Sequence, residues 1–148
     1  MIAIGCDHGG YELKKEIEAY LDSRGLEYRD YGCDSTDSVD YPIYARKVAH
    51  AIVDGECEKG ILICGTGIGV SIAANKVPGA YAALVNNVYQ AQRAQLSNNA
   101  NIITLGAQVT GIELAKCLVK ECLSVTFDPE SRSMPKVARI TEYEKEGK

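Results

Sequence analysis

An apolar run that leads directly into a glycine-rich turn constrains this chain more than any other feature. Residues 60–64 read GILIC, a continuous apolar stretch that is typical of a central strand in a parallel sheet covered on both faces. Residues 65–69 read GTGIG, and the helix-forming sequence VSIAANK follows. We therefore predict a strand, a tight turn and a helix in succession, which is the unit that builds parallel sheets.

The same alternation of strand and helix signals runs along the rest of the chain. Short apolar runs predict further strands at residues 2–6, 27–31, 80–85 and 101–105. Helical spacing of apolar residues predicts helices that cover residues 11–24, 42–54, 88–96, 110–122 and 136–146. Five strands joined by helical crossovers imply an α/β fold, in which helices cover both faces of a five-stranded parallel sheet to give three layers.

One helix start carries a specific sequence signature. Residues 110–113 read TGIE, the spacing of a capping box in which the hydroxyl of Thr110 and the carboxylate of Glu113 satisfy free backbone N–H groups. We therefore expect Thr110 to be the N-cap of the helix that follows.

Length and composition bound the class of protein. The chain has 148 residues, of which 46 % are apolar, enough to bury one core and too few for two ordinary domains. We expect a single domain over residues 1–148, with residues 134–148 packing either on this subunit or on a partner. The apolar runs are too short to cross a membrane, and the sequence MIAIGCDHGG lacks the features of a secretory signal, so we expect a cytoplasmic protein.

Charge and cysteine spacing narrow the choice of ligand. The six cysteines include no CxxC pair, so we expect free thiols and neither a disulfide framework nor a metal site. The net charge of −4 argues against a nucleic-acid partner, because nucleic acids are bound chiefly by neutralising their phosphates. An anionic ligand must therefore be bound by a local group of donors.

Three polar clusters lie beside the predicted strands. Asp7 and His8 follow the first strand, and residues 64–69 follow the strand at 60–64. Because ligands of such sheets bind beyond the carboxyl ends of the strands, we expect these two clusters to converge. Residues 97–101 instead precede a strand, so we expect them near the other edge of the sheet or facing a neighbouring molecule.

The turn at residues 65–69 can bind an anion through its backbone. Free N–H groups at a helix start favour a negative charge, and glycine lets a ligand approach the main chain. The spacing departs from GxGxxG, and GxxxxGK[ST] is absent, so NAD and ATP are poor candidates. The alternative is that the glycines only allow a strand to pack closely on a helix.

Single residues suggest the chemistry. Cys64 lies just before the turn, where the helix start would favour its thiolate, and a thiolate there could accept a proton; the alternative is a buried apolar cysteine, which we expect of Cys6. Asp7 can accept from a sugar hydroxyl or orient the ring of His8. His50 lies within a predicted helix, and we expect it to be a surface residue.

At this point the chain resembles the type B ribose-5-phosphate isomerases and their galactose-6-phosphate isomerase relatives. The resemblance rests on the sequences IGCDHGGYELK, DYP at 40–42, ILICGTGIGVSIAANKVPG, NNANIITLG and GIELA, and covers nearly the whole chain. It implies a Rossmann-like fold, aldose–ketose isomerisation without metal or other cofactor, and a homodimer or dimer of dimers whose active sites are shared by two subunits.

The resemblance also implies a role for each matching residue. Cys64 would be the base that moves a proton between C1 and C2 of the phosphorylated aldose or ketose, and Thr66 would assist it. Asn98 would reach in from the neighbouring subunit. The remaining matches divide into backbone groups that stabilise the enediolate, Gly65, Gly67, Ile68 and Gly69, and side chains that hold the sugar, Asp7 and His8.

The chain departs from the family pattern at the positions that open the sugar ring and bind phosphate. The family's ring-opening histidine falls on Ser97, and a usual arginine falls on Gln108. The arginine pair that binds phosphate falls on Ser131, with Arg132 adjacent, and on Lys136. A lysine binds phosphate as a point charge without the fork of an arginine.

These departures leave the substrate open. Ribose 5-phosphate is the first expectation, and galactose 6-phosphate, allose 6-phosphate or a tetrose phosphate are alternatives. The chain could also be one subunit of a hetero-oligomeric isomerase, or an inactive protein that binds a sugar phosphate.

Overall fold

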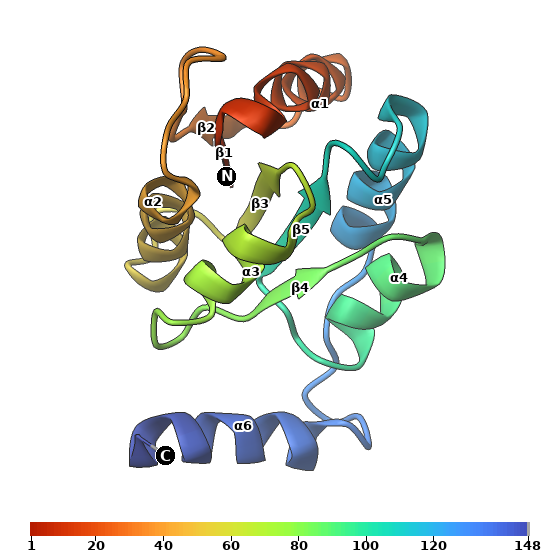
Figure 1. Cartoon of the computed structure of the whole chain (residues 1–148). Coiled ribbons are helices and arrows are strands. Elements are labelled where there is room, and N and C mark those ends of the chain that lie inside the picture. The colour runs from red at the N-terminus through yellow and green to blue at the C-terminus, as the bar shows by residue number, and fades with distance from the viewer. Residues whose placement is uncertain (148) are drawn as a thin grey trace.

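All strands of the central sheet run parallel, in the spatial order β2-β1-β3-β5-β4 (Figure 1). The computed structural model describes residues 1–147, and within them the sheet has five strands. The strands are β1 (Ile2–Cys6), β2 (Tyr28–Asp30), β3 (Lys59–Cys64), β4 (Ala82–Leu84) and β5 (Ile102–Gly106). The predicted five-stranded parallel sheet is confirmed.

Helices cover both faces of this sheet. A short 3-10 helix η1 (His8–Gly10) follows β1, and the α-helices are α1 (Tyr11–Ser23), α2 (Tyr41–Val53), α3 (Ile68–Ala74), α4 (Val88–Leu96), α5 (Ile112–Ser124) and α6 (Met134–Glu146). Helices α1, α4 and α5 pack on one face, and α2 and α3 pack on the other (Figure 1). The three-layer α/β architecture is therefore confirmed. No helix within residues 1–147 is long and apolar enough to cross a membrane.

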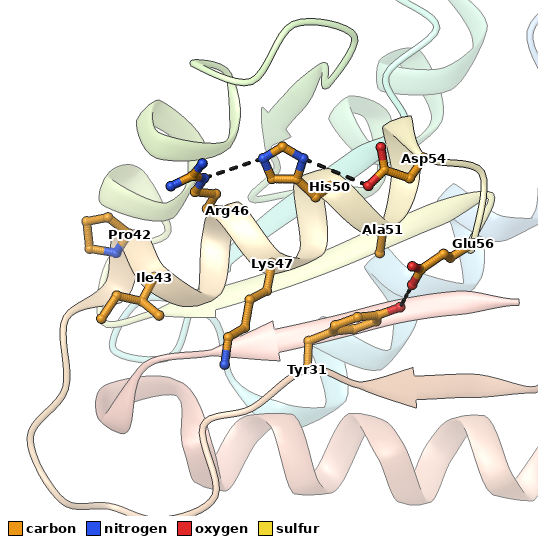
Figure 2. Close-up of a pocket in the computed structure, with 9 residues that line it drawn as sticks. All are labelled: Tyr31, Pro42, Ile43, Arg46, Lys47, His50, Ala51, Asp54 and Glu56. Atoms are coloured by element: carbon orange, nitrogen blue, oxygen red, sulfur yellow. Dashed lines mark hydrogen bonds and ion pairs between the residues drawn. The ribbon is translucent and has the colours of Figure 1, made fainter.

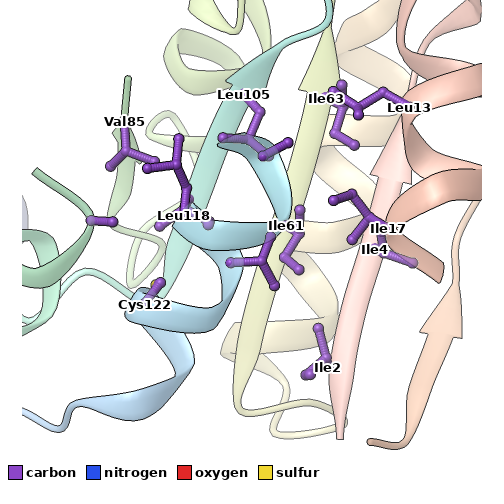
Figure 3. Close-up of a cluster of buried hydrophobic side chains, with 14 of the residues drawn as sticks. Ile2, Ile4, Leu13, Ile17, Ile61, Ile63, Val85, Leu105, Leu118 and Cys122 are labelled. Carbon is purple, nitrogen blue, oxygen red and sulfur yellow. The ribbon is translucent and has the colours of Figure 1, made fainter. Parts of the chain in front are cut away.

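The core divides into two layers because successive side chains of a strand point to opposite faces. On β3, Ile61 and Ile63 point toward α1 and α5, whereas Leu62 points toward α2 and α3. Figure 3 shows the first layer, in which Ile61 lies between Ile17 of α1 and Leu118 of α5. Burying each such branched side chain contributes about 1.5–3 kcal/mol, and both faces of β3 are buried.

The predicted capping box at the start of α5 is wrong. The helix begins at Ile112, Gly111 is its N-cap, and no side chain caps it. Thr110 belongs instead to the turn after β5, where the carbonyl of Gly106 accepts hydrogen bonds from Val109 N (3.0 Å) and Thr110 N (2.8 Å). This turn uses the residue that the sequence pattern assigned to the cap, and the helix starts after it.

The last helix lies apart from the sheet layers (Figure 1). Glu144 of α6 accepts from Tyr81 Oη (2.9 Å) and from Gly79 N (3.1 Å), so the helix contacts the segment before β4 of its own chain. Of its residues only Val137 is buried, and Ile140 and Tyr143 are exposed. Lys148, the last residue of the segment expected to pack here or on a partner, lies outside the described residues.

Candidate active site

The two polar clusters predicted to converge do lie side by side. Strands β1 and β3 are adjacent, and the chain continues from β1 to one side of the sheet and from β3 to the other side. Ligands of parallel sheets bind at such a point, beyond the carboxyl ends of the two strands. Asp7 N donates to Ile63 O (3.2 Å), and a Cβ added to Gly9 would lie 3.5 Å from Gly65 N. The turn after β1 therefore contacts the turn after β3.

The turn at residues 65–69 is fixed to the middle of the sheet by the segment that follows β5. Ala107 N donates to Cys64 O (2.9 Å), Gln108 N donates to Gly65 O (2.9 Å), and Thr104 Oγ1 donates to Gly67 O (2.8 Å). Gly67 has φ = 78°, a conformation that favours glycine. These bonds hold the backbone of the turn in place before any ligand binds.

Cys64 lies at the bottom of this turn. Its side chain is buried, and its Sγ accepts a hydrogen bond from Gly67 N (3.1 Å). Within residues 1–147, the N–H groups of Gly65 and Thr66 donate to no protein acceptor. The turn therefore combines a sulfur base with free backbone donors that can bind an oxyanion.

Asp7 and His8 are held at the edge of the same site. Asp7 is buried and its Oδ1 accepts from Gly10 N (3.1 Å), so it caps η1 as well as facing the turn. Val39 N donates to His8 Nδ1 (3.1 Å), which places the proton of a neutral ring on Nε2. His8 can therefore donate a proton from Nε2.

Two further side chains lie on the turn. Gln108, which we expected at a substrate-binding position, lies over Gly65, because a Cβ added to Gly65 would be 3.4 Å from Gln108 Cδ. The ring of Tyr41 lies over Gly69, where an added Cβ would be 2.5 Å from Tyr41 Cε1. We had not selected Tyr41 as a site residue, although it stands in the sequence DYP on which the resemblance partly rests.

A second group of predicted residues lines a separate cavity of about 680 Å³. Its polar lining consists of Ser97, Asn98, Arg132 and Lys136, which we predicted, and Tyr89, Arg93 and Ser133, which we did not. Arg93 could have been selected from the sequence, because it lies one helical turn before Ser97 and therefore on the same face of the helix. Asn101, by contrast, has a structural role, because its side chain bonds Tyr81 N (2.8 Å) and Gly79 O (2.9 Å).

The two groups lie at opposite ends of the strands. Ser97 and Asn98 precede β5, whose first residue Ile102 pairs with Gly60, whereas Cys64 pairs with Gly106 at the far end of β5. Five residues of a strand span roughly 16 Å. One chain therefore holds the sulfur base and the cationic cavity apart.

Another cavity, of about 620 Å³, lies outside α2 and away from both groups (Figure 2). His50 lines it, accepts from Arg46 Nε (3.4 Å) and lies 4.0 Å from Asp54 Oδ2, with its side chain 44 % exposed. The expectation that His50 is a surface residue is confirmed.

The six cysteines form no disulfide within residues 1–147. All six are free thiols, and burial raises the pKa of Cys6 to about 12, which leaves Cys6 neutral and apolar. No group of three or more His, Cys, Asp or Glu side chains in residues 1–147 is placed to hold a metal ion.

Comparison with known proteins agrees with this geometry. Residues 2–140 match the profile of the family described as Ribose/Galactose Isomerase. The chain is 46 % identical to ribose-5-phosphate isomerase B of Escherichia coli, over 97 % of this chain and 95 % of that protein. It is 48 % identical to D-erythrulose-4-phosphate isomerase of Pectobacterium atrosepticum, over 99 % and 97 % of the two chains.

Solved structures give the same result. The structure of ribose-5-phosphate isomerase B from Clostridium thermocellum superposes with a TM-score of 0.96 at 48 % identity, over 99 % of each chain. A family profile that spans most of the chain, and full-length relatives at this identity, leave no room for a different fold or a different family. The chain belongs to the ribose/galactose isomerase family.

Proposed function

We propose that this protein is an aldose–ketose isomerase that interconverts ribose 5-phosphate and ribulose 5-phosphate, with Cys64 as the base. The observation that carries the proposal is the turn after β3, where Cys64 Sγ lies 3.1 Å from Gly67 N beside the free N–H groups of Gly65 and Thr66. Relatives named as ribose-5-phosphate isomerase B at 46 % and 42 % identity support the choice of substrate.

The reaction needs one base and a site for one negative charge. The Cys64 thiolate takes the proton from C2 of the open aldose, and the electrons move to the C1 carbonyl oxygen to form an enediolate. The backbone donors of Gly65 and Thr66 bind that oxygen, and Cys64 then returns the proton to C1. The proton on O2 moves to O1, a transfer that the hydroxyl of Thr66 assists, and the product is the ketose.

The phosphate is bound by a second subunit in this proposal. Arg132 and Lys136 line a cavity that a single chain keeps away from Cys64, and Asn98 lines the same cavity. A homodimer, or a dimer of dimers, that places this cavity over the turn of its neighbour completes each active site. Substrate binding at the shared site also involves Asp7, His8 and Gln108. We further place the protein in the cytoplasm, where pentose phosphates are metabolised.

The single-domain organisation is part of the same proposal. The first group of site residues lies at the ends of the strands of one sheet, and the second group joins α4 to the segment that leads into α6, so we treat residues 1–148 as one isomerase domain. The exposed Ile140 and Tyr143 of α6 support packing of that helix on a partner subunit.

The test replaces the base and follows hydrogen exchange. The Cys64→Ala variant should lose roughly 10²- to 10⁴-fold in turnover, because a positioned general base contributes that much. In D₂O the wild-type protein should incorporate deuterium at C2 of ribose 5-phosphate, and the variant should not, while its affinity for inorganic phosphate stays the same.

The matched control is Cys57→Ala, which removes another buried thiol, one that lies next to Tyr31 and away from the turn. Its turnover should stay within a few-fold of the wild-type value. Cys64→Ala with near wild-type turnover would assign the base to another residue, and an absence of exchange in the wild-type protein would indicate a binding protein.

A tetrose phosphate is the second candidate substrate, and Ser97 favours it. A hydroxyl is a poor acid for opening a sugar ring, and the furanose ring of a tetrose 4-phosphate cannot form because its 4-hydroxyl carries the phosphate. Two relatives, at 48 % and 45 % identity, are named as D-erythrulose-4-phosphate isomerases. Comparing kcat/KM for erythrose 4-phosphate and ribose 5-phosphate decides between the candidates.

A further inference from the structure

Three cationic side chains line the cavity beside Ser97. Arg93, Arg132 and Lys136 form no ion pair with any acidic side chain of residues 1–147. Elsewhere on this acidic chain cations do pair, as Lys116 does with Glu113 and Arg139 with Glu142. Three uncompensated positive charges around one cavity of about 680 Å³ point to an anionic ligand.

Arg93 differs from the other two cations because it is half-buried and already oriented. Its Nε donates to Ser97 Oγ at 2.7 Å, across one turn of α4. The guanidinium has five N–H donors in a rigid plane, and this bond uses one. Arg93 lines the same cavity as Arg132 and Lys136, so its remaining donors can serve a ligand there.

The same bond determines what Ser97 can do. With Oγ accepting from Arg93, the hydroxyl proton of Ser97 is free to be donated to another acceptor. The backbone adds to this arrangement, because Ser97 N donates to Arg93 O (2.8 Å) at the end of the helix. Ser97 is therefore held as a hydrogen-bond donor at the wall of the cavity.

We propose that Arg93 has two roles in sugar-phosphate isomerisation: it is a third cation of the phosphate-binding cavity, and it positions Ser97 to donate a hydrogen bond to a sugar oxygen. This inference rests on the proposed function, because the ligand class is the phosphorylated sugar. The first role predicts an effect of Arg93 on phosphate affinity. The second predicts an effect on turnover that requires Ser97.

The experiment is a double-mutant cycle of Arg93→Gln and Ser97→Ala, with two readouts. Affinity for inorganic phosphate is measured by calorimetry, and kcat and KM are measured with the sugar phosphate that the wild-type protein turns over best. Arg93→Gln should weaken phosphate binding roughly 10-fold, because it removes a charge-assisted contact, and Arg93→Lys should recover most of that loss. Arg93→Gln should lower kcat in the wild-type background and leave kcat unchanged in the Ser97→Ala background.

The matched control is Arg139→Gln, which removes the same charge from an exposed position of α6 outside the lining of the cavity. Its phosphate affinity should stay within twofold of the wild-type value. If Arg93→Gln also leaves the phosphate affinity within twofold of the wild-type value, the first role is wrong. If the effects of Arg93→Gln and Ser97→Ala on kcat simply multiply, the second role is wrong. Comparing the thermal unfolding of all variants, Arg93→Lys included, separates these losses from misfolding.

Phosphate binding does not depend on turnover, so the two proposals can fail separately. A wild-type protein that isomerises no sugar phosphate but binds phosphate through Arg93 would overturn the proposed function and support the cationic cavity. An active isomerase whose Arg93→Gln variant matches the wild-type protein in both readouts would overturn only the inference about Arg93.

Discussion

Ser97 stands where the resemblance leads us to expect the residue that opens the sugar ring. The resemblance places a histidine at this position, and the structure places the Ser97 hydroxyl 2.7 Å from Arg93 Nε in a cationic cavity. A hydroxyl can donate a hydrogen bond, but it cannot release a proton to a ring oxygen near neutral pH as a histidine can. If the natural substrate forms a ring, we expect His8, with its Nε2 proton available, to be the acid that opens it.

The Ser97→His variant should therefore act selectively. We expect it to raise kcat/KM for ribose 5-phosphate, whose ring must open, and to change little for erythrose 4-phosphate, whose chain is open. Steady-state rates with the two sugars at one pH measure this. The Ser97→Asn variant is the control, because it adds a polar side chain without an acid. Equal changes for both sugars would contradict the idea that ring opening is limited at this position.

A second residue-scale feature is a buried network between α1 and β2. Lys14 is fully buried and donates to Asp30 Oδ1 (2.6 Å) and Cys33 O (2.7 Å). Burial alone would raise the pKa of Asp30, but the Lys14 ammonium and Gly32 N hold it below its usual value. Burial, reinforced by the neighbouring Asp30, raises the pKa of Glu18 despite its bond to Lys15. The Oε1 atom of Glu18 is buried without a hydrogen-bond partner in residues 1–147.

Glu18 should make the free energy of unfolding depend on pH. Because its pKa is raised in the folded chain, its favourable contribution is complete below the unfolded pKa and is lost as pH rises through the folded pKa. Glu18→Gln removes this loss, so the variant should differ least from the wild-type protein near pH 4 and should be more stable than the wild-type protein at pH 8.

Urea unfolding at the two pH values measures this difference. Glu16→Gln, on the exposed side of the same helix, is the control and should show no comparable pH dependence. A Glu18→Gln variant that is less stable than the wild-type protein at pH 8 would show that the bond to Lys15 outweighs the cost of burial.

At the scale of elements, the sequence predicts best where burial is most complete. Strand β3 is buried on both faces, and its continuous apolar run identifies it. Strand β2 is a three-residue edge strand with two exposed positions, so its five-residue prediction is too long. The prediction of a capping box was wrong because Thr110 N donates to the carbonyl of Gly106 in a turn. The local sequence pattern does not predict that hydrogen bond.

The candidate site divides in the same way. The positions of Asp7, His8 and the Cys64 turn follow from their places after adjacent parallel strands, so sequence reasoning could find them. Tyr41 contacts Gly69 from the start of α2. The two residues are far apart in the sequence, so residue spacing does not predict this contact. Arg93 was missed because its importance depends on which residues of α6 share its cavity.

The close contact between β5 and the turn after β3 can be tested by a substitution at Gly106, the last residue of β5. A Cβ on Gly106 would lie 2.6 Å from the backbone C and O of Thr66, and neither atom can move as a flexible side chain could. Gly106→Ala should cost about 1–3 kcal/mol of unfolding free energy and should lower kcat, because the free N–H groups of the turn shift. Urea unfolding and steady-state kinetics measure the two effects.

Gly111→Ala is the matched control. Gly111 has φ = −67°, and nothing lies within 4 Å of an added Cβ, so this variant should be neutral or slightly more stable. Gly106→Ala with the stability and kcat of Gly111→Ala would show that the turn tolerates displacement.

At the scale of the whole molecule, the chain carries two groups of candidate site residues at opposite ends of the strands. Apolar side chains are exposed next to both groups, Ile68 and Ile72 (57 % exposed) beside the turn and Tyr89 (71 % exposed) beside the cationic cavity. A contact with another subunit would remove these apolar side chains from water. Both observations support an assembly in which each subunit covers the other.

Shared sites predict that two inactive variants restore activity when mixed. A Cys64→Ala chain lacks the base, and an Arg132→Gln, Lys136→Gln chain lacks phosphate contacts. In a random 1:1 mixture refolded together, about a quarter of all sites would combine two intact halves, so about a quarter of wild-type activity should appear. Mixing without refolding is the control for subunit exchange. Activity equal to the mean of the two variants would place each complete site within one chain.

The hydrogen bonds from Ala107 and Gln108 to the turn after β3 also bear on how water is kept from the reaction. A turn bonded to the central strands cannot fold over a bound sugar as a mobile lid does. An enediolate nevertheless has to be shielded from solvent while it exists. In the proposed assembly the neighbouring subunit would be the cover, and product release would then require that small groups at the rim, such as Tyr41 and Gln108, or the subunits themselves, move.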